Sequence, residues 1–309
     1  MFRGCRTARF AKVAVWGGGT MGGGIAQVVA SSGYAVSVVE VNADRCNAAQ
    51  KNISGSLSRV FKKKFETANP KATADEVAAH VKTSTSDVMS KINFSTDGAA
   101  VAATSDLIIE AVVENLEVKN QLWKSLDPIA KPTCVFATNT SSLSVAAQAA
   151  VTKRSTQFGG LHFFSPVAMM KLVEIVTLDQ TDPNVKTQLR DFVTKIGKAP
   201  VMCSDTKGFI VNRLLVPYML EAARLVERGV ATVEDVDVAM KLGAGHPMGP
   251  FKLCDSVGID VIKLITDAWH KEEPQNPLFN PVKLIDDKVA AGHVGMKAGE
   301  GFYKYPAKK

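Results

Sequence analysis

The apolar positions of the first 39 residues alternate between a strand pattern and a helix pattern. Residues 13–16 form a short apolar run that three consecutive glycines stop, and apolar side chains then recur at helical spacing up to Gly33. A second apolar run, rich in valine, fills residues 35–39. Strand, glycine turn, helix and strand in this order predict a βαβ unit, and such a unit requires a parallel sheet.

The pattern changes and then returns farther along the chain. Residues 42–80 are rich in lysine and alanine without a strand pattern, and Asn69-Pro70 divides them, so we expect an inserted helical hairpin. Apolar strand runs and helical segments alternate after it. Strands are expected at residues 107–113, 134–138, 158–161 and 172–176, with helices at residues 116–126 and 185–196. This alternation predicts a doubly wound α/β domain.

Only helical patterns follow residue 203. They cover residues 209–228, 233–241 and 257–269. Within the first of them, Pro217 predicts a bend or a compensated hydrogen bond. The chain is therefore expected to consist of a basic N-terminal extension (1–12), an α/β domain (13–206) and an all-α C-terminal domain (207–309).

Composition and charge narrow the class of protein. With 46% hydrophobic and 22% charged residues among 309, the chain has ordinary globular composition and a length suited to two domains. The formal charge of +7 comes from 37 basic and 30 acidic residues spread along the chain, without a zinc-finger or RNA-binding signature. This argues against nucleic-acid binding and favours an anionic ligand. No apolar run approaches the roughly 20 residues of a membrane span, so we expect a soluble protein.

The N-terminus is basic, because Arg3, Arg6, Arg9 and Lys12 all precede the first acidic residue, Glu40. Two interpretations fit this segment: the start of a transit peptide to the mitochondrial matrix, or a basic tail on a cytoplasmic protein. The five cysteines are odd in number and lack a CxxC pair. They are expected to be reduced thiols, with neither a disulfide framework nor a metal site.

A glycine motif predicts the cofactor. The pattern G-x-G-x-x-G is formed by Gly17, Gly18, Gly19, Thr20, Met21 and Gly22. It is weak alone, but here it follows a strand, opens a helix and is followed by Glu40 at the end of the next strand. In a dinucleotide site Gly17 permits the tight turn, Gly19 lets the backbone approach the pyrophosphate, and Gly22 lets helix and strand pack closely.

Glu40 bears on the choice between NAD and NADP. Its carboxylate would accept hydrogen bonds from the adenosine ribose and would repel the 2′-phosphate of NADP, so NAD is favoured. The alternative is a generic strand-to-helix turn followed by a solvated carboxylate.

A histidine and a glutamate suggest acid–base chemistry. His162 ends an apolar strand, where open α/β sheets place their ligands, and Glu174 interrupts the apolar run 172–176. A carboxylate that orients an imidazole creates a general base, which hydride transfer from an alcohol needs. The residues alone also allow a buried His and Glu in unrelated hydrogen bonds.

Six stretches in order along nearly the whole chain resemble the L-3-hydroxyacyl-CoA dehydrogenase family, of the short-chain type. They are Gly17 to Gly22, Ala111 to Leu116, Thr138 to Leu143, Leu161 to Phe164, Gly208 to Arg213, and Gly299 to Tyr303. The resemblance implies a Rossmann-like domain and a helical C-terminal domain that forms a homodimer. It also implies reversible oxidation of L-3-hydroxyacyl-CoA to 3-ketoacyl-CoA with NAD in fatty acid beta-oxidation, with the substrate between the two domains.

The same resemblance implies roles for individual residues. His162 is the general base, Glu174 its partner, and Ser141 and Asn212 contact the substrate oxygen. The residues that line the NAD site are Gly17, Gly19, Thr20, Met21, Gly22, Glu40, Glu114, Lys119, Ser141, Ser165 and Lys297. Ser56 and Lys63 meet coenzyme A, and the charge of Lys62-Lys63-Lys64 suits that anion, although such a run is otherwise a solvated surface.

Two residues depart from the family pattern, which commonly has Asp at position 40 and Asn at position 165. Glu40 keeps the acceptors on a longer side chain, whereas the shorter Ser165 would lose or reroute a contact to the nicotinamide ribose. Two alternative functions stay open at this point. One is a 3-hydroxybutyryl-CoA dehydrogenase, and the other is a non-catalytic, crystallin-like relative.

Overall fold

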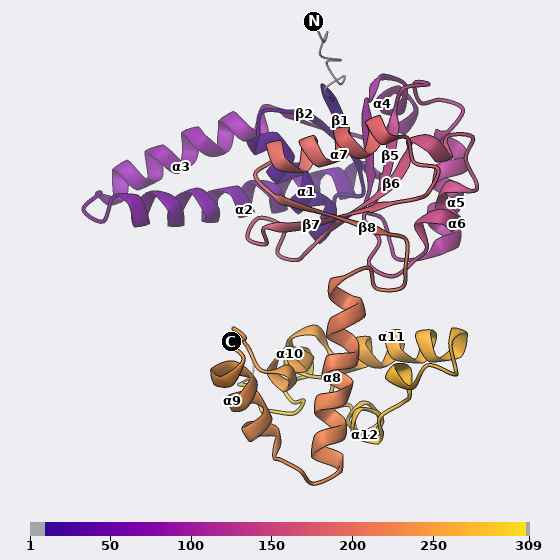
Figure 1. Cartoon of the computed structure of the whole chain (residues 1–309). Helices are drawn as coiled ribbons and strands as arrows, with labels where there is room; N and C mark the ends of the chain where they lie inside the picture. Colours follow the sequence, from indigo (N-terminus) through magenta and orange to yellow (C-terminus); the bar gives the residue numbers. More distant parts are fainter. Residues whose placement is uncertain (1–9, 307–309) are drawn as a thin grey trace, which may run out of the picture. The chain divides into compact units, whose positions relative to one another are not determined.

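The computed structural model describes residues 10–306, and Figure 1 shows how their elements are arranged. Most of the basic segment considered for targeting (residues 1–9), together with Cys5, lies outside the described residues. The chain divides into two compact units, one up to Phe209 and one from Ile210 onward.

The first unit is built on an eight-stranded sheet with the order β3-β2-β1-β4-β5-β6-β7-β8. The strands are β1 (Lys12–Trp16), β2 (Ala35–Val39), β3 (Ile92–Ser95), β4 (Leu107–Glu110), β5 (Val135–Thr138), β6 (Phe158–Phe163), β7 (Leu172–Thr177) and β8 (Ala199–Ser204). Every neighbouring pair is parallel except β6 and β7. The strand order reverses between β2-β1 and β4-β5, so the predicted doubly wound, Rossmann-like fold is confirmed.

Helices cover both faces of this sheet. They are α1 (Thr20–Ser31), α4 (Gly98–Thr104), α5 (Leu116–Leu126), α6 (Val145–Ala149) and α7 (Pro183–Lys195). One apolar cluster packs α1 and α7 against one face through Ile25 and Leu189. A second packs α4, α5 and α6 against the other face around the fully buried Trp123. Alternate residues of each strand point to opposite faces, so the sheet holds a core on each side.

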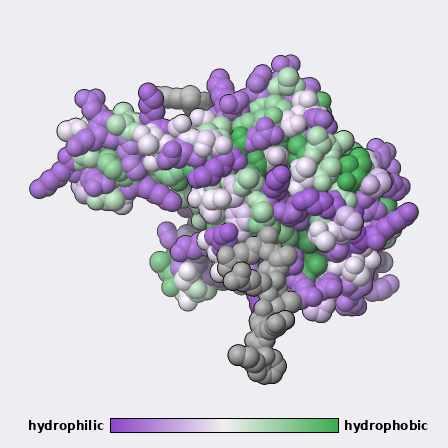
Figure 2. All heavy atoms as spheres, turned by 90° about the horizontal axis from the view of Figure 1, so that it is seen from above, coloured by the Kyte–Doolittle hydropathy of each residue, from purple (hydrophilic) through white to green (hydrophobic). Residues whose placement is uncertain are grey.

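The expected helical hairpin projects from this unit as α2 (Ala43–Ala68) and α3 (Ala74–Met89) (Figure 1). Asn42 caps α2, and a capping box between Thr73 and Glu76 starts α3 directly after the Asn69-Pro70 break. Figure 2 shows that hydrophilic residues cover most of the hairpin, at the left of that view.

The structure changes several predicted boundaries in the first unit. The strand expected at 107–113 ends at Glu110, because the Glu110 carboxylate accepts a hydrogen bond from the Val112 N–H and turns the chain. The strand expected at 158–161 continues to Phe163, so His162 lies one residue before its end. The antiparallel direction of β7 was not predicted, because residues 164–171 form a loop that brings the chain straight back.

The second unit is helical, as predicted. It contains α8 (Val211–Glu227), α9 (Val233–Gly243), α10 (Pro250–Val257), α11 (Ile259–Glu272) and α12 (Lys283–Ala290) around one apolar core. Helix α8 continues through the buried Pro217. The helix expected at 257–269 is α11, which begins two residues later because Gly258 adopts φ +106° and separates it from α10. None of the described helices is long and apolar enough to cross a membrane.

Candidate active site

The glycine turn after β1 is shaped by close backbone contacts. Gly17 adopts φ +93°, and a Cβ there would lie 2.6 Å from the Ala111 carbonyl oxygen. A Cβ on Gly22 would lie 1.8 Å from the Gly17 carbonyl oxygen, so only glycine lets α1 start this close to the strand end. At Gly19, by contrast, a Cβ would meet no protein atom within 4 Å. These positions fit a tight turn whose backbone a pyrophosphate can approach.

A cavity of about 630 Å³ opens beside this turn. Its lining comes from the start of α1, from the facing side of α2 and from the loop after β6. These residues include Gly19, Thr20, Ser56, Arg59 and Ser165. Four predicted ligand contacts, Gly19, Thr20, Ser56 and Ser165, therefore share one cavity. The Met21 side chain instead packs partly buried against the core.

The Glu40 carboxylate is tied to the glycine turn. Its Oε1 accepts a hydrogen bond from the Gly18 N–H at 2.6 Å, and its Oε2 accepts one from the Val41 N–H at 3.2 Å. It is therefore held next to the turn at the carboxyl end of β2. This is the position from which an acidic residue reaches an adenosine ribose.

His162 and Glu174 form a buried pair. They are direct register partners in the antiparallel β6–β7 ladder, and His162 Nδ1 lies 2.7 Å from Glu174 Oε2. His162 is 5% exposed and Glu174 is fully buried. The imidazole partner explains how the Glu174 acid can occupy the middle of an apolar strand. In return, the carboxylate fixes the tautomer and orientation of the imidazole.

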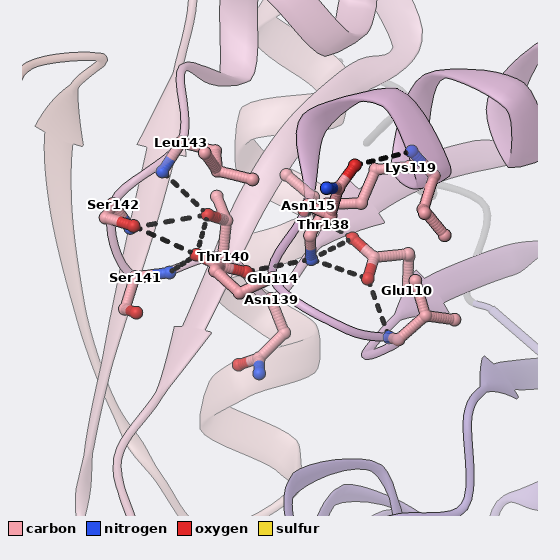
Figure 3. Close-up of polar contacts among 12 residues, drawn as sticks. Glu110, Glu114, Asn115, Lys119, Thr138, Asn139, Thr140, Ser141, Ser142 and Leu143 are labelled. Carbon is pink, nitrogen blue, oxygen red and sulfur yellow. Dashed lines mark hydrogen bonds and ion pairs between the residues drawn. The ribbon is translucent and has the colours of Figure 1, made fainter.

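A second buried acid organises the loops beside this pair (Figure 3). The Glu110 carboxylate, at the end of β4, accepts hydrogen bonds from Lys119 Nζ at 2.6 and 2.8 Å and from the hydroxyl of its register partner Thr138 at 2.6 Å. Both Glu110 and Lys119 have fully buried side chains. A carboxylate and an ammonium buried together neutralise each other, whereas either charge buried alone would be strongly destabilising.

The same ammonium also pairs with Glu114, whose Oε2 lies 3.1 Å from Lys119 Nζ. Glu114 Oε1 accepts hydrogen bonds from the Thr140 hydroxyl, the Ser141 N–H and the Ser142 hydroxyl. Burial by itself would raise the pKa of Glu114, but the Lys119 charge and these donors outweigh it and hold that pKa below its ordinary value. Glu114 is therefore ionised at neutral pH and holds the loop that carries Ser141.

Two further side chains, those of Asn139 and Lys198, hold the loops near His162. Asn139 Oδ1 accepts a hydrogen bond from the Phe163 N–H at 2.9 Å, which ties the end of β5 to the residue after His162. The buried Lys198 donates through Nζ to the Val167 and Met170 carbonyl oxygens at 2.5 and 2.6 Å. Both carbonyls belong to the loop between β6 and β7, so Lys198 fixes the connection between the strands of His162 and Glu174.

Comparison with known proteins identifies the family. Residues 12–206 match the model described as 3-hydroxyacyl-CoA dehydrogenase, NAD binding domain, and residues 208–305 match the C-terminal domain of the same family. The chain belongs to the 3-hydroxyacyl-CoA dehydrogenase family. Because the matched first domain is an NAD-binding one, the predicted cofactor is also confirmed.

The sequences of individual relatives align with this 3-hydroxyacyl-CoA dehydrogenase over nearly its full length. The mitochondrial hydroxyacyl-coenzyme A dehydrogenase of Rattus norvegicus is 51% identical over 293 residues, which cover 95% of this chain and 90% of the rat protein. A probable 3-hydroxyacyl-CoA dehydrogenase of Caenorhabditis elegans is 48% identical, with 97% and 95% covered. The crystal structure of (S)-3-hydroxybutyryl-CoA dehydrogenase PaaH1 from Ralstonia eutropha superimposes with a TM-score of 0.87 at 34% identity, covering 96% of this chain and 100% of that one.

The structure places most of the predicted site residues of this dehydrogenase in the first unit. Ser141 is exposed in the loop after β5, and Lys63 is exposed on α2. Lys119 has no exposed surface, so it would act on a bound cofactor only through Glu114. Asn212, in the first turn of α8, and Lys297, whose Nζ lies 2.6 Å from an Asp260 carboxylate oxygen, belong to the second unit.

Sequence reasoning missed Glu110, Thr138, Thr140, Asn139 and Lys198. A signal for Glu110 was present, because an acid interrupts the apolar run 107–113 just as Glu174 interrupts its own strand. Thr138, Asn139 and Thr140 lie in the stretch Thr138 to Leu143 that carries the family resemblance, but no role was predicted for them. Lys198 carries no signal, since an isolated lysine outside a motif is ordinary on a protein surface.

Proposed function

We propose that this protein catalyses the reversible oxidation of L-3-hydroxyacyl-CoA to 3-ketoacyl-CoA in fatty acid beta-oxidation. The family match identifies an NAD-dependent 3-hydroxyacyl-CoA dehydrogenase. The observation that carries the chemistry is the buried His162–Glu174 pair at the carboxyl side of the sheet. Such a pair supplies the base that an alcohol needs before it can lose a hydride.

In the proposed reaction His162 removes the proton of the C3 hydroxyl. With Nδ1 engaged by Glu174, Nε2 is the atom that would take this proton. NAD, when bound, supplies the acceptor for the hydride that leaves C3. The O–H and C3–H bonds break as the C3–O double bond forms, and the Glu174 carboxylate stabilises the resulting imidazolium. In the opposite direction His162 returns the proton to the oxygen of the 3-ketoacyl group.

The remaining proposed contacts follow the family motif. Ser141 and Asn212 would hydrogen-bond the C3 oxygen and stabilise its developing charge. The turn from Gly17 to Gly22 would hold the pyrophosphate, and Glu40 the adenosine ribose. Glu114 and Ser165 would face the nicotinamide half of NAD, and the resemblance adds Lys297 to this site.

The hairpin α2–α3 is the proposed place for coenzyme A. Ser56 lines the cavity beside the glycine turn, and Lys63 lies farther along the same helix within the exposed run Lys62-Lys63-Lys64. Hydroxyl and ammonium groups suit the phosphates of coenzyme A. Lys63→Glu should therefore raise KM for the acyl-CoA while leaving KM for NADH unchanged.

Acyl chain length defines a second candidate. Relatives from Mycobacterium tuberculosis and Ralstonia eutropha are named 3-hydroxybutyryl-CoA dehydrogenases, at 41% and 34% identity. Identity to the mitochondrial hydroxyacyl-CoA dehydrogenases is higher, which favours the broader substrate class. A series of 3-ketoacyl-CoA substrates of increasing length separates the two functions, because a 3-hydroxybutyryl-CoA enzyme loses activity beyond the shortest member.

We also propose a mitochondrial location and a homodimer. Mitochondrial relatives of rat, mouse, pig and human, at 50–51% identity, support the location. Exposed leucines on the second unit support the dimer: Leu214 is 70% exposed, Leu242 is 77% and Leu264 is 71%. Light scattering of the purified protein measures its mass, and a monomer would contradict the dimer.

The decisive experiment follows NADH consumption with acetoacetyl-CoA and longer 3-ketoacyl-CoA substrates, with NADPH in parallel. We expect rapid turnover with NADH, and His162→Gln should lower kcat by about 10² to 10⁴ fold. The matched control is His293→Gln, since His293 is a half-buried histidine of the second unit. No turnover despite NADH binding would favour the crystallin-like alternative, and a variant that keeps more than about a tenth of kcat would refute His162 as the base.

A further inference from the structure

Three charged side chains lie between the end of β4 and the first turn of α5, and their charges do not cancel. Glu110 and Glu114 each contribute a carboxylate, and Lys119 contributes the ammonium between them. Their formal charges are −1, −1 and +1, so the group as a whole carries one negative charge. We call these three residues the charge triad.

Burial and hydrogen bonds fix the three charged groups beside the loops of the site, so the surplus negative charge is localised there. Glu110 and Lys119 are fully buried, and water cannot screen them. Thr140, Ser141 and Ser142 hold the Glu114 carboxylate (Figure 3). Its side chain is 37% exposed, so it is the member of the triad that faces outward. Lys119 together with the hydrogen bonds from Thr140 and Ser141 keeps it ionised, and the surplus charge is permanent at neutral pH.

The position of the charge triad follows from the strand order. The glycine turn and Glu40 lie at the carboxyl ends of β1 and β2, which is the adenosine side of the sheet. The opposite half of a dinucleotide crosses the switch point towards the carboxyl ends of β4, β5 and β6. Glu110 ends β4, Thr138 ends β5, and His162 lies next to the end of β6. If His162 is the base of the proposed function, the nicotinamide ring lies in this region, beside the charge triad.

We propose that the charge triad favours the oxidised cofactor over the reduced one, and that Glu110 contributes to this preference without touching the cofactor. The nicotinamide ring is a cation in NAD⁺ and neutral in NADH. One net negative charge near the ring therefore stabilises bound NAD⁺ and has little effect on bound NADH. Glu110 is a positioning residue in this proposal, because it holds Lys119 and adds its own charge from within the core.

The test measures dissociation constants of NAD⁺ and NADH for a set of variants that differ in the net charge of the triad. Glu114→Gln and Glu110→Gln both bring it from −1 to 0. The double variant Glu110→Gln with Lys119→Met returns it to −1 without a buried unpaired ion. Asp191→Asn is the control. This exposed residue precedes Phe192, which packs on Phe10 and Tyr34 just before β1 and β2 begin, so it lies by the amino ends of these strands and not by the carboxyl ends where the triad lies. Isothermal titration calorimetry gives both constants without turnover.

The expected readout is the ratio Kd(NAD⁺)/Kd(NADH). It should rise about threefold to tenfold in Glu114→Gln, the size expected for one charge in a partly solvated site, and less in Glu110→Gln. The double variant should return towards the wild-type ratio, and Asp191→Asn should keep it. A merely structural role of these residues would change both constants by the same factor.

A ratio that stays constant across the charge variants would overturn the proposal. If Glu110→Gln does not fold, Glu114→Gln decides, because its side chain is partly exposed and the amide oxygen can still accept from the Thr140 hydroxyl and the Ser141 N–H. This inference rests on the proposed function in one respect: the nicotinamide ring is placed beside the charge triad because His162 is the proposed base. A ratio that follows the charge in a protein without turnover would refute the proposed function alone, whereas turnover with a constant ratio would refute the charge effect alone.

Discussion

Glu174 lies directly opposite His162 in the antiparallel β6–β7 ladder, and its Oε2 is 2.7 Å from His162 Nδ1. The loop between the two strands is fixed by Lys198, which donates to the carbonyl oxygens of Val167 and Met170. Two strands and one buried lysine thus set the orientation of the imidazole.

Glu174→Gln should lower kcat by about 10² fold while the NADH dissociation constant changes little. The amide keeps the size of the side chain but removes the charge that stabilises the imidazolium. Steady-state kinetics and NADH fluorescence titration measure the two quantities, and urea unfolding shows whether the variant folds. A loss of kcat below threefold would mean that Glu174 does not support the base.

Two glycines of the turn should respond differently to the same change. Gly22→Ala places a Cβ 1.8 Å from the Gly17 carbonyl oxygen, and we expect the free energy of unfolding to fall by about 3 kcal/mol. Gly19→Ala meets no protein atom within 4 Å, so the fold should keep its stability while NADH binds more weakly. Urea unfolding and NADH titration of both variants check this. Equal loss of stability in the two variants would contradict the assigned roles.

Glu40 should control the choice between NAD and NADP. In Glu40→Gln the carbonyl oxygen can still accept from the Gly18 N–H, but the charge that repels a 2′-phosphate is gone. We expect kcat/KM for NADPH relative to NADH to rise about tenfold. The control is the exposed Asp191→Asn. An unchanged ratio would show that Glu40 only holds the glycine turn.

Alkaline pH should weaken the first unit through Cys134. Burial, partly offset by the nearby Arg154 charge, raises the pKa of this thiol to about 12, whereas it titrates near 9 when unfolded. The folded state thus keeps a proton that the unfolded state loses, so this contribution is complete below pH 9 and declines as pH rises towards 12.

Urea unfolding between pH 8 and pH 11 tests this prediction. The free energy of unfolding should fall with pH in the native chain and fall less steeply in Cys134→Ala. The alanine variant should also lose some stability at pH 8, because a small buried side chain is removed. Parallel curves for the two proteins would show that Cys134 does not contribute to the alkaline loss.

The elements that the sequence predicted are those with a strong local signal. The glycine turn, the βαβ unit and the helical hairpin follow from side-chain spacing and from residues such as Gly17 and Pro70 that restrict the backbone conformation. Weakly patterned elements were missed: β3, α4, α6, α10 and α12 are short, and their apolar positions do not fill a clear period.

By itself the sequence determined the classes of fold and family, the cofactor, and the identity of His162 and Glu174 as candidates, because these depend on local pattern and on residue type. Only the tertiary structure decided which groups meet. The antiparallel return of β7 places Glu174 opposite His162, and the parallel register of β4 and β5 brings Glu110 to Thr138. The same packing buries Lys119 between two acids that lie before it in the chain. Such contacts join residues far apart in sequence or hidden on a helix face, and no periodicity records them.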